Sequence, residues 1–128
     1  MNQRRSIYLE NFSHKNPIPV ASRIGPFLFS GALTGRDLRT RDMPESLEEQ
    51  CANIFTLVRL VLEAEGGSTD QIGKITFHLA DYRDRAALNR EWLDMFPDPA
   101  AMPARQVLAA SLDGGALIHA DLVAVFST

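Results

Sequence analysis

The sequence has few of the residues that build disulfides and metal centres. Its 128 residues include one cysteine, Cys51, and three histidines, which follow no known metal-ligand spacing. A single cysteine cannot close an internal disulfide, which is typical of proteins from a reducing compartment. Cys51 falls on the apolar positions of an expected helix, so we interpret it as a buried and unreactive thiol. The sequence therefore predicts no metal site.

Long apolar runs and an excess of positive charge are also missing. No segment approaches the roughly 20 apolar residues that a membrane-spanning helix needs, so we expect no membrane partner. Lys and Arg number 13 against 16 Asp and Glu, which gives a net charge of −3. This balance predicts no nucleic-acid partner, because it provides no general attraction for phosphates. The first residues lack the apolar stretch of a secretory signal, and we expect a cytoplasmic protein.

The chain has the size of one domain, and we expect a single domain over residues 1–128. Turn signals and apolar periodicity predict strands at Ser6–Leu9, Val20–Arg23, Phe27–Ser30, Ile72–Ala80, Gln106–Ser111 and Ala116–Phe126, a helix from Leu47 to the stop at Gly66–Gly67, and a helix from Asp84 to Phe96. Ser46 and Glu49 form a capping box for the first helix, and Asp84 is the expected N-cap of the second. The turn Leu112–Gly115 predicts that the last two strands form a hairpin.

These elements predict an α+β fold, with a mixed sheet of about six strands and both helices on one face. The last strand carries mostly apolar residues in both of its registers, from Leu117 to Phe126. An antiparallel strand with one face in water would alternate apolar and polar residues. Another layer must therefore cover the second face, and a further copy of the chain is the simplest such layer. We expect an obligate homo-oligomer.

Arg105 stands immediately before the least charged stretch of the chain. From Gln106 to Thr128 the only formal charges are Asp113, in a turn, and Asp121, in the last strand. A guanidinium beside so much apolar surface needs an anionic partner. That partner is either a carboxylate of the protein or the carboxylate of a small ligand, and the residues alone leave both open.

Asp121 and His119 are two residues apart on the last strand and therefore point to the same face. A carboxylate in such apolar surroundings must be hydrogen-bonded, paired or shifted in pKa. One interpretation is an ion pair across a subunit interface, with Arg105 as one partner to consider. The other is a general base, or a group that holds a water molecule, in a cleft between subunits. His78 lies beside an apolar register, and we interpret it as an interior or interface histidine.

Ser30 and Gly31 end the third expected strand, and Gly35 follows. The glycine spacing is not that of a phosphate-binding loop. Gly31 is either a turn residue or a point where a ligand lies against the backbone and bonds its amides. No nucleophile elbow or dinucleotide fingerprint is present, so these residues by themselves name no reaction.

Several segments, taken together, resemble the RidA (YjgF/YER057c) family of small trimeric proteins. The matching segments are Phe27–Gly31, Glu65–Ser68, Lys74–Leu79, Ala87–Asn89 with Trp92 and Phe96, Pro103–Arg105, and Gly115–Leu117 with the terminal strand. The resemblance covers nearly the whole chain, from about residue 15 to residue 126.

The resemblance implies a chorismate-mutase-like subunit whose sheet packs against two others around a threefold axis. It implies sites in the clefts between subunits, where 2-imino or 2-enamino acids are hydrolysed to 2-oxo acids and ammonia. It also implies that no metal or organic cofactor takes part. The expected partners are therefore further copies of the chain, in a homotrimer, and a small carboxylate.

The resemblance also implies roles for individual residues. Arg105 matches the arginine that binds the substrate carboxylate through two N–H groups. Asp121 falls where the deaminases have a glutamate that positions the attacking water. The pocket positions of the family fall on Ile18, Ser30, Gly31, Asn89 and Val107.

Three of these positions depart from the family pattern. Pro17–Pro19 replaces a Pro-Tyr-Ser segment, which puts Ile18 in place of a phenol, and Val107 replaces a cysteine. Asp121 is one methylene shorter than glutamate, and a misplacement of about 1 Å can lower a rate about a hundredfold. These departures predict a paralogous branch that acts on a different acidic imine or enamine.

Three functions follow from these patterns. The favoured one is an imine or enamine deaminase that uses Arg105 and Asp121. A non-catalytic protein that binds 2-oxo acids would use the same cleft without turnover. RNA cleavage has been attributed to some family members, but the net charge of −3 and the lack of a basic patch with aromatic residues disfavour it.

Overall fold

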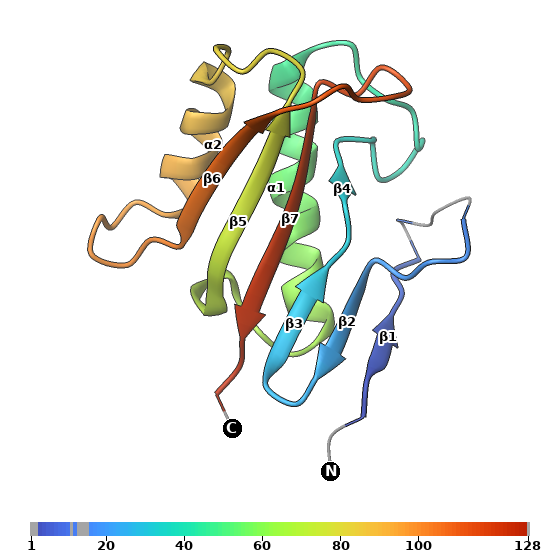
Figure 1. The fold of residues 1–128 in the computed structure, drawn as a ribbon, viewed down its shortest axis with the longest axis vertical. Helices are drawn as coiled ribbons and strands as arrows, with labels where there is room; N and C mark the ends of the chain where they lie inside the picture. The colour runs from blue at the N-terminus through green and yellow to red at the C-terminus, as the bar shows by residue number, and fades with distance from the viewer. Residues whose placement is uncertain (1–2, 11, 13–15, 128) are drawn as a thin grey trace.

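The computed structural model describes residues 3–10, 12 and 16–127, and it contains one mixed sheet with both helices on the same face (Figure 1). In chain order the elements are β1 (Arg5–Ile7), β2 (Ala21–Ile24), β3 (Phe27–Ser30), β4 (Leu33–Thr34), α1 (Leu47–Ala64), a 3-10 turn (Thr69–Gln71), β5 (Ile72–Leu79), α2 (Ala86–Met95), β6 (Ala104–Ala109) and β7 (Ile118–Val125). The predicted fold class is confirmed, although the sheet has seven strands and not about six. The short strand β4 was not foreseen.

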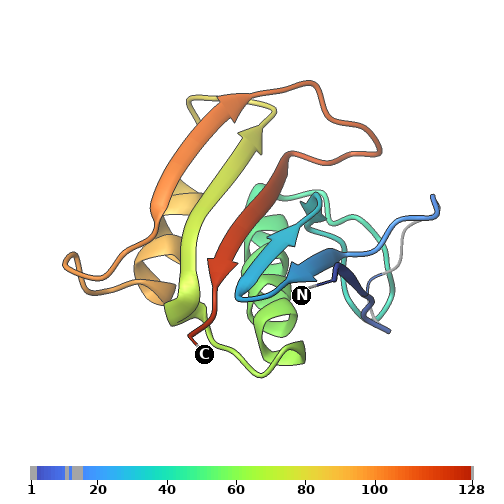
Figure 2. The same ribbon diagram turned by 60° about the horizontal axis from the view of Figure 1, so that its bottom comes forward.

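The strands are ordered β1-β2-β3-β7-β5-β6, and β4 pairs with β7 beyond the end of β3. Every pairing is antiparallel except that of β5 with β6. The predicted hairpin between the last two strands is therefore wrong, because β5 lies between β6 and β7. The cause is a parallel crossover, in which α2 carries the chain from the end of β5 to the start of β6 (Figures 1 and 2).

The segment 110–117 links β6 to β7 by passing over the end of β5. The Ala110 N–H donates to the Leu79 carbonyl at 3.1 Å, and the Ala80 N–H donates to the Leu117 carbonyl at 3.0 Å. Gly114 and Gly115 have φ values of 66° and 80°, which glycine adopts readily. The two glycines do mark a turn, as predicted, but the turn belongs to a wider connection than a two-residue hairpin.

Gln50 on α1 is fully buried and fixes this connection to the helix. Its Nε2 donates to the carbonyls of Pro44, at 2.7 Å, and Gly115, at 3.0 Å. Its Oε1 accepts from the Leu117 N–H at 2.7 Å. Gly35 packs against the backbone of Gln50, where a Cβ atom would lie 2.6 Å from the Gln50 Cα. A buried amide with this many partners satisfies the rule that interior polar groups are hydrogen-bonded.

Helix α1 begins and ends where the sequence predicts. The Ser46 side chain accepts a hydrogen bond from the Glu49 N–H at 3.2 Å, and Gly66, with φ at 74°, follows the last turn. Its buried face includes the expected residues Leu47, Cys51, Ile54, Val58, Val61 and Leu62. Each of these side chains is at most 9% exposed, so the periodic pattern identified the core-facing side.

Helix α2 begins at Ala86, and its N-cap is Arg85. The prediction that Asp84 caps this helix is wrong: the helix has no side-chain cap among the described residues, and Asp84 belongs to the preceding turn, where its N–H donates to the Asp81 carbonyl. The buried face of α2 includes Trp92, whose ring meets Phe77 of the sheet edge-on at a centroid distance of 6.2 Å. Aromatic packing of this kind holds the helix against β5.

The sheet has one covered face and one open face. On β5, Ile75, Phe77 and Leu79 are buried against the helices, while Thr76 and His78 on the other side are partly exposed. On the open face of β3 and β7, Phe27 is 44% exposed, Phe29 42% and Val125 45%. Such a row of exposed aromatic and aliphatic side chains is the uncovered apolar face that the last strand predicted. Self-association through this face remains a prediction.

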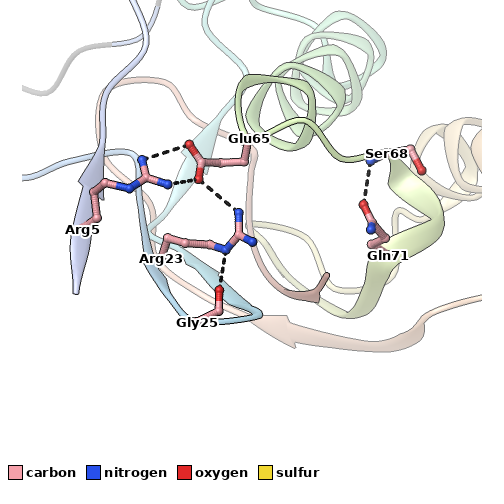
Figure 3. A network of polar contacts seen from close by, with 6 residues as sticks. All are labelled: Arg5, Arg23, Gly25, Glu65, Ser68 and Gln71. Atoms are coloured by element: carbon pink, nitrogen blue, oxygen red, sulfur yellow. Dashed lines mark hydrogen bonds and ion pairs between the residues drawn. The ribbon is translucent and has the colours of Figure 1, made fainter. Parts of the chain in front are cut away.

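A carboxylate at the end of α1 ties that helix to the first two strands (Figure 3). Glu65 is paired with Arg5 of β1 and with Arg23 of β2, whose Nη1 lies 3.2 Å from Oε1. The Glu65 side chain is only 8% exposed. The two guanidinium groups lower the pKa of Glu65, with the hydrogen bond from Arg5 as the largest cause. The Arg23 guanidinium also lies 4.0 Å from the centre of the Phe126 ring.

Candidate active site

Arg105 lies within strand β6, which begins one residue earlier, and not in front of the strand as the sequence predicted. Its register partner on β5 is Ile75, so its side chain lies on the helix-covered face. The Arg105 Cζ is 5.2 Å from the centre of the Trp92 ring, a cation–π distance. Strand β6 is an edge of the sheet, so this half-buried guanidinium lies beside an open strand edge.

No carboxylate among the described residues lies within 4.0 Å of the Arg105 guanidinium. Burial, and then the positive charge of Arg85, lower the pKa of Arg105. Its ordinary pKa is so high that the group stays charged at neutral pH. Of the two partners that the sequence left open, the protein carboxylate is therefore not found among the described residues. The Arg105 guanidinium is free to bind the carboxylate of a ligand.

Asp121 does not meet Arg105 within one chain. Its register partner on β5 is Thr76, which puts Asp121 on the open face of the sheet, whereas the partner of Arg105 is the buried Ile75. The two side chains therefore lie on opposite faces with β5 between their strands. An Asp121 carboxylate can reach an Arg105 guanidinium only if a second copy of the chain supplies it.

Two further predicted site residues lie near Arg105. Val107 is two residues further along β6, on the same face, and it packs against the core. Asn89 is exposed on α2 and precedes Trp92 by three residues, a spacing that makes helix positions neighbours. Arg105, Val107, Asn89 and Trp92 therefore form one group at the α2–β6 edge, which we call the arginine edge.

The remaining predicted residues lie around the ends of β2 and β3. The Ser30 Oγ accepts a hydrogen bond from the Leu122 N–H at 2.9 Å and donates to the Gly31 carbonyl at 2.9 Å. The Gly31 N–H donates to the Val20 carbonyl at 2.9 Å, so this amide is already used within the chain. Ile18 is 48% exposed. We call Ile18, Ser30, Gly31 and the neighbouring Asp121 the serine group.

Gly31 fits neither of the two interpretations drawn from the sequence, a turn that requires glycine or an amide that bonds a ligand. It is not among the glycines with positive φ, so the turn itself does not demand glycine. Its amide is satisfied by Val20 and is not free for a ligand. A Cβ atom built there would meet nothing closer than 3.8 Å. What glycine provides at this position is an exposed, uncovered stretch of backbone.

The arginine edge and the serine group are too far apart to form one cleft in a single chain. Strands β7 and β5 lie between β3 and β6. At about 4.8 Å per strand, the two groups are separated by about 14 Å, and Arg105 faces the other side of the sheet from Asp121. One protomer therefore contains two half-sites.

The histidines on the open face form a pair that the sequence did not reveal. His78 of β5 and His119 of β7 are register partners. Burial, and then the neighbouring His78, lower the pKa of His119, while Asp113 raises it slightly. Strand alternation puts each histidine on a face, but only the observed pairing of β5 with β7 puts them opposite each other. No group of three or more metal-binding side chains occurs in the described part of the chain.

Two other features lie apart from these half-sites. Cys51 is fully buried, and burial is the main cause that raises its pKa to about 12, so the thiol stays protonated and unreactive, as predicted. A hollow of about 390 Å³ lies beside α1, lined mainly by apolar side chains such as Tyr8, Leu38 and Leu57. None of the predicted site residues lines it.

Comparison with known proteins identifies the family. The family model described as endoribonuclease L-PSP matches residues 8–126, and the chain belongs to this family, which is the RidA/YjgF family. A RutC family protein of Aquifex aeolicus is 31% identical over 117 residues, covering 87% of this chain and 94% of the relative. The resemblance stated from the sequence is thereby confirmed.

Two further matches bear on fold and activity. A 2-iminobutanoate/2-iminopropanoate deaminase of Dermatophagoides farinae is 23% identical over 111 residues, which is 85% of each chain. The crystal structure of RidA from an Antarctic Psychrobacter superposes with a TM-score of 0.87 at 22% identity, covering 95% of this chain and 99% of the other. That structure supports the fold. Among the described residues, no helix is long and apolar enough to cross a membrane.

Proposed function

We propose that the protein is a hydrolytic deaminase of reactive 2-imino or 2-enamino carboxylic acids, acting as a homotrimer. The observation that supports this most directly is Arg105, a half-buried cation with no described carboxylate in reach, held on an aromatic ring beside an open strand edge. The deaminase named among its relatives, at 23% identity, agrees with this chemistry.

The trimer completes the site in this proposal. The exposed Phe27, Phe29 and Val125 give the open face an apolar surface on which another copy can pack. Packing of neighbouring copies then brings the arginine edge of one protomer to the serine group of the next. This arrangement also explains why one chain carries the two halves on separate parts of its sheet.

The reaction needs orientation and proton transfer. Arg105 holds the substrate carboxylate through two N–H groups, which fixes the C=N carbon in place. A water molecule, held by Asp121 of the neighbouring copy, adds to that carbon while its proton moves to the nitrogen. The hydroxyl proton of the resulting carbinolamine then moves to its nitrogen, the C–N bond breaks, ammonia leaves, and the carbon keeps the water oxygen as the carbonyl of a 2-oxo acid.

A binding protein without turnover is the second candidate. The observation that favours it is Asp121, whose short carboxylate lies partly buried on a largely apolar face. A carboxylate too far from the substrate carbon would leave a site that still binds 2-oxo acids through Arg105. Binding without ammonia release distinguishes this candidate from the deaminase.

The test is ammonia release from 2-iminobutanoate generated in situ, measured against spontaneous hydrolysis. We expect the protein to accelerate release, and Arg105→Ala to return the rate to the spontaneous value. The matched control is Arg90→Ala, which removes an exposed arginine from α2 outside the proposed site and should keep the wild-type rate. If the wild-type protein releases no ammonia above background from a panel of 2-imino and 2-enamino acids, the deaminase proposal fails.

A further inference from the structure

A second arginine lies beside the arginine edge and was not singled out from the sequence. Arg85 is the N-cap residue of α2. Its Nε donates to the Tyr82 carbonyl at 3.0 Å, and its Cζ lies 4.2 Å from the centre of the Tyr82 ring. These two contacts with Tyr82 fix the direction of the Arg85 side chain. Because the side chain is already ordered, binding a ligand would cost it little conformational entropy.

Arg85 and Arg105 lie along the same face of α2. Arg85 and Trp92 are seven residues apart, or about two turns, so they share a face of α2. Trp92 is the residue whose ring carries the Arg105 guanidinium. The positive charge of Arg85 also lowers the pKa of Arg105. The two cations therefore face the same region of the α2–β6 edge.

No carboxylate in the described part of the chain balances this pair. The described ion pairs are Arg5–Glu65, Arg23–Glu65 and Arg83–Asp81, and neither Arg85 nor Arg105 belongs to one. Two like charges in a partly buried region repel each other unless anions are supplied. A ligand with one carboxylate satisfies Arg105 and leaves Arg85 without an anionic partner, whereas a ligand with two carboxylates satisfies both.

We propose that Arg85 binds a second carboxylate, so that the preferred substrate is a dicarboxylic 2-imino acid held by Arg85 at one end and Arg105 at the other. This inference rests on the proposed function, because it concerns the same site. The hydrolysis itself is unchanged: water adds to the C=N carbon next to the carboxylate on Arg105, and ammonia leaves. Arg85 determines which acids bind, and Tyr82 positions its guanidinium.

The test compares two acids that differ only at the far end. The probes are 2-oxopentanoate and 2-oxoglutarate, which have the same five-carbon chain and end in a methyl group and a carboxylate. Calorimetry on the full-length protein should show 2-oxoglutarate binding about tenfold more tightly or better, as expected for a hydrogen-bonded ion pair. Arg85→Gln should reduce this ratio of dissociation constants to near one, and Arg85→Lys should restore part of it.

Arg83→Gln is the matched control. It removes the same charge two residues away, from a side chain that is 90% exposed and paired with Asp81. This variant should keep the wild-type preference for the dicarboxylate, and unchanged thermal melting of all three variants shows that they fold. A matching preference should appear in turnover, with 2-iminoglutarate hydrolysed more efficiently than 2-iminopentanoate.

The outcomes separate this inference from the proposed function. If both acids bind equally well to the wild-type protein, or if Arg83→Gln lowers the ratio as much as Arg85→Gln, the inference is overturned and the deaminase proposal stands. If neither acid binds and neither imine is hydrolysed, both fail together.

Discussion

His78 and His119 lie directly opposite each other on β5 and β7, on the face of the sheet that carries the exposed Phe27 and Phe29. Facing residues on antiparallel strands have Cβ atoms about 4.5–5.5 Å apart, so two imidazolium ions at these positions would repel each other. The lowered pKa of His119, caused by burial and then by His78, reflects this arrangement. Covering this face with another copy would remove further water from both rings.

Self-association should therefore weaken in acid. Burial already lowers the pKa of His119 below its ordinary value of about 6.5, and covering the face would lower it further, so association favours the neutral ring and weakens as the pH falls below that value. We expect sedimentation to show a tighter oligomer at pH 7.5 than at pH 5.0. His119→Gln should flatten this dependence, and His78→Gln should reduce it. An oligomer of equal strength at both pH values would contradict this prediction.

The exposed aromatic side chains of β3 should hold the oligomer together. Phe29 is 42% exposed on the open face, and its ring stacks on Phe27 at a centroid distance of 6.3 Å. Phe29→Asp would place a charge in the proposed interface, where burial without a partner is costly. We expect light scattering to give the mass of a monomer for this variant.

Tyr8→Asp is the control for the interface variant. Tyr8 is 70% exposed and lines the hollow beside α1, apart from the open face and from both half-sites. This substitution also introduces an aspartate at an exposed apolar position, and it should leave the mass of the oligomer unchanged. If Phe29→Asp keeps the wild-type mass, another surface must mediate association.

Glu65 should contribute measurably to stability. Glu65→Gln keeps the size of the side chain but removes the charge that Arg5 and Arg23 share, and it should lower the free energy of unfolding by about 1–3 kcal/mol. Because the folded-state pKa of Glu65 is lowered, this stabilisation is present above its ordinary pKa and is lost as the pH falls through the folded value. Urea unfolding at pH 7 and at pH 3 should show a smaller difference between wild type and variant in acid. Glu63→Gln, two residues away and outside this network, should change little at either pH.

The sequence was informative wherever the signals were local. The Ser46 cap, the apolar stripe of α1 and the stop at Gly66 depend on neighbouring residues, and each is in its expected place. The two-sided apolar character of the last strand also predicted the open face correctly. Arg105 could be singled out because a cation before a long uncharged stretch needs an anionic partner, whatever the fold.

The order of the strands could not be predicted in the same way. The glycines of Leu112–Gly115 fit a hairpin turn and a wider connection equally well, and only the parallel crossover through α2 decides between them. The same limitation hid the opposite facing of Arg105 and Asp121, since it depends on their partners Ile75 and Thr76. Arg85 could not be recognised as a candidate site residue, because its position near Arg105 depends on where Trp92 and β6 lie in the fold.

The buried amide of Gln50 has a consequence for motion. It clamps the Gly115 carbonyl and the Leu117 N–H of an irregular segment onto the middle of the fold, so that this segment cannot open unless α1 shifts with it. The Leu117 amide proton should consequently exchange with deuterium about as slowly as those of the central strands, despite lying outside them. In Gln50→Leu, the same proton should exchange rapidly while those of β5 remain protected. One uncharged side chain in the interior thus restrains an irregular connection that has no regular secondary structure of its own.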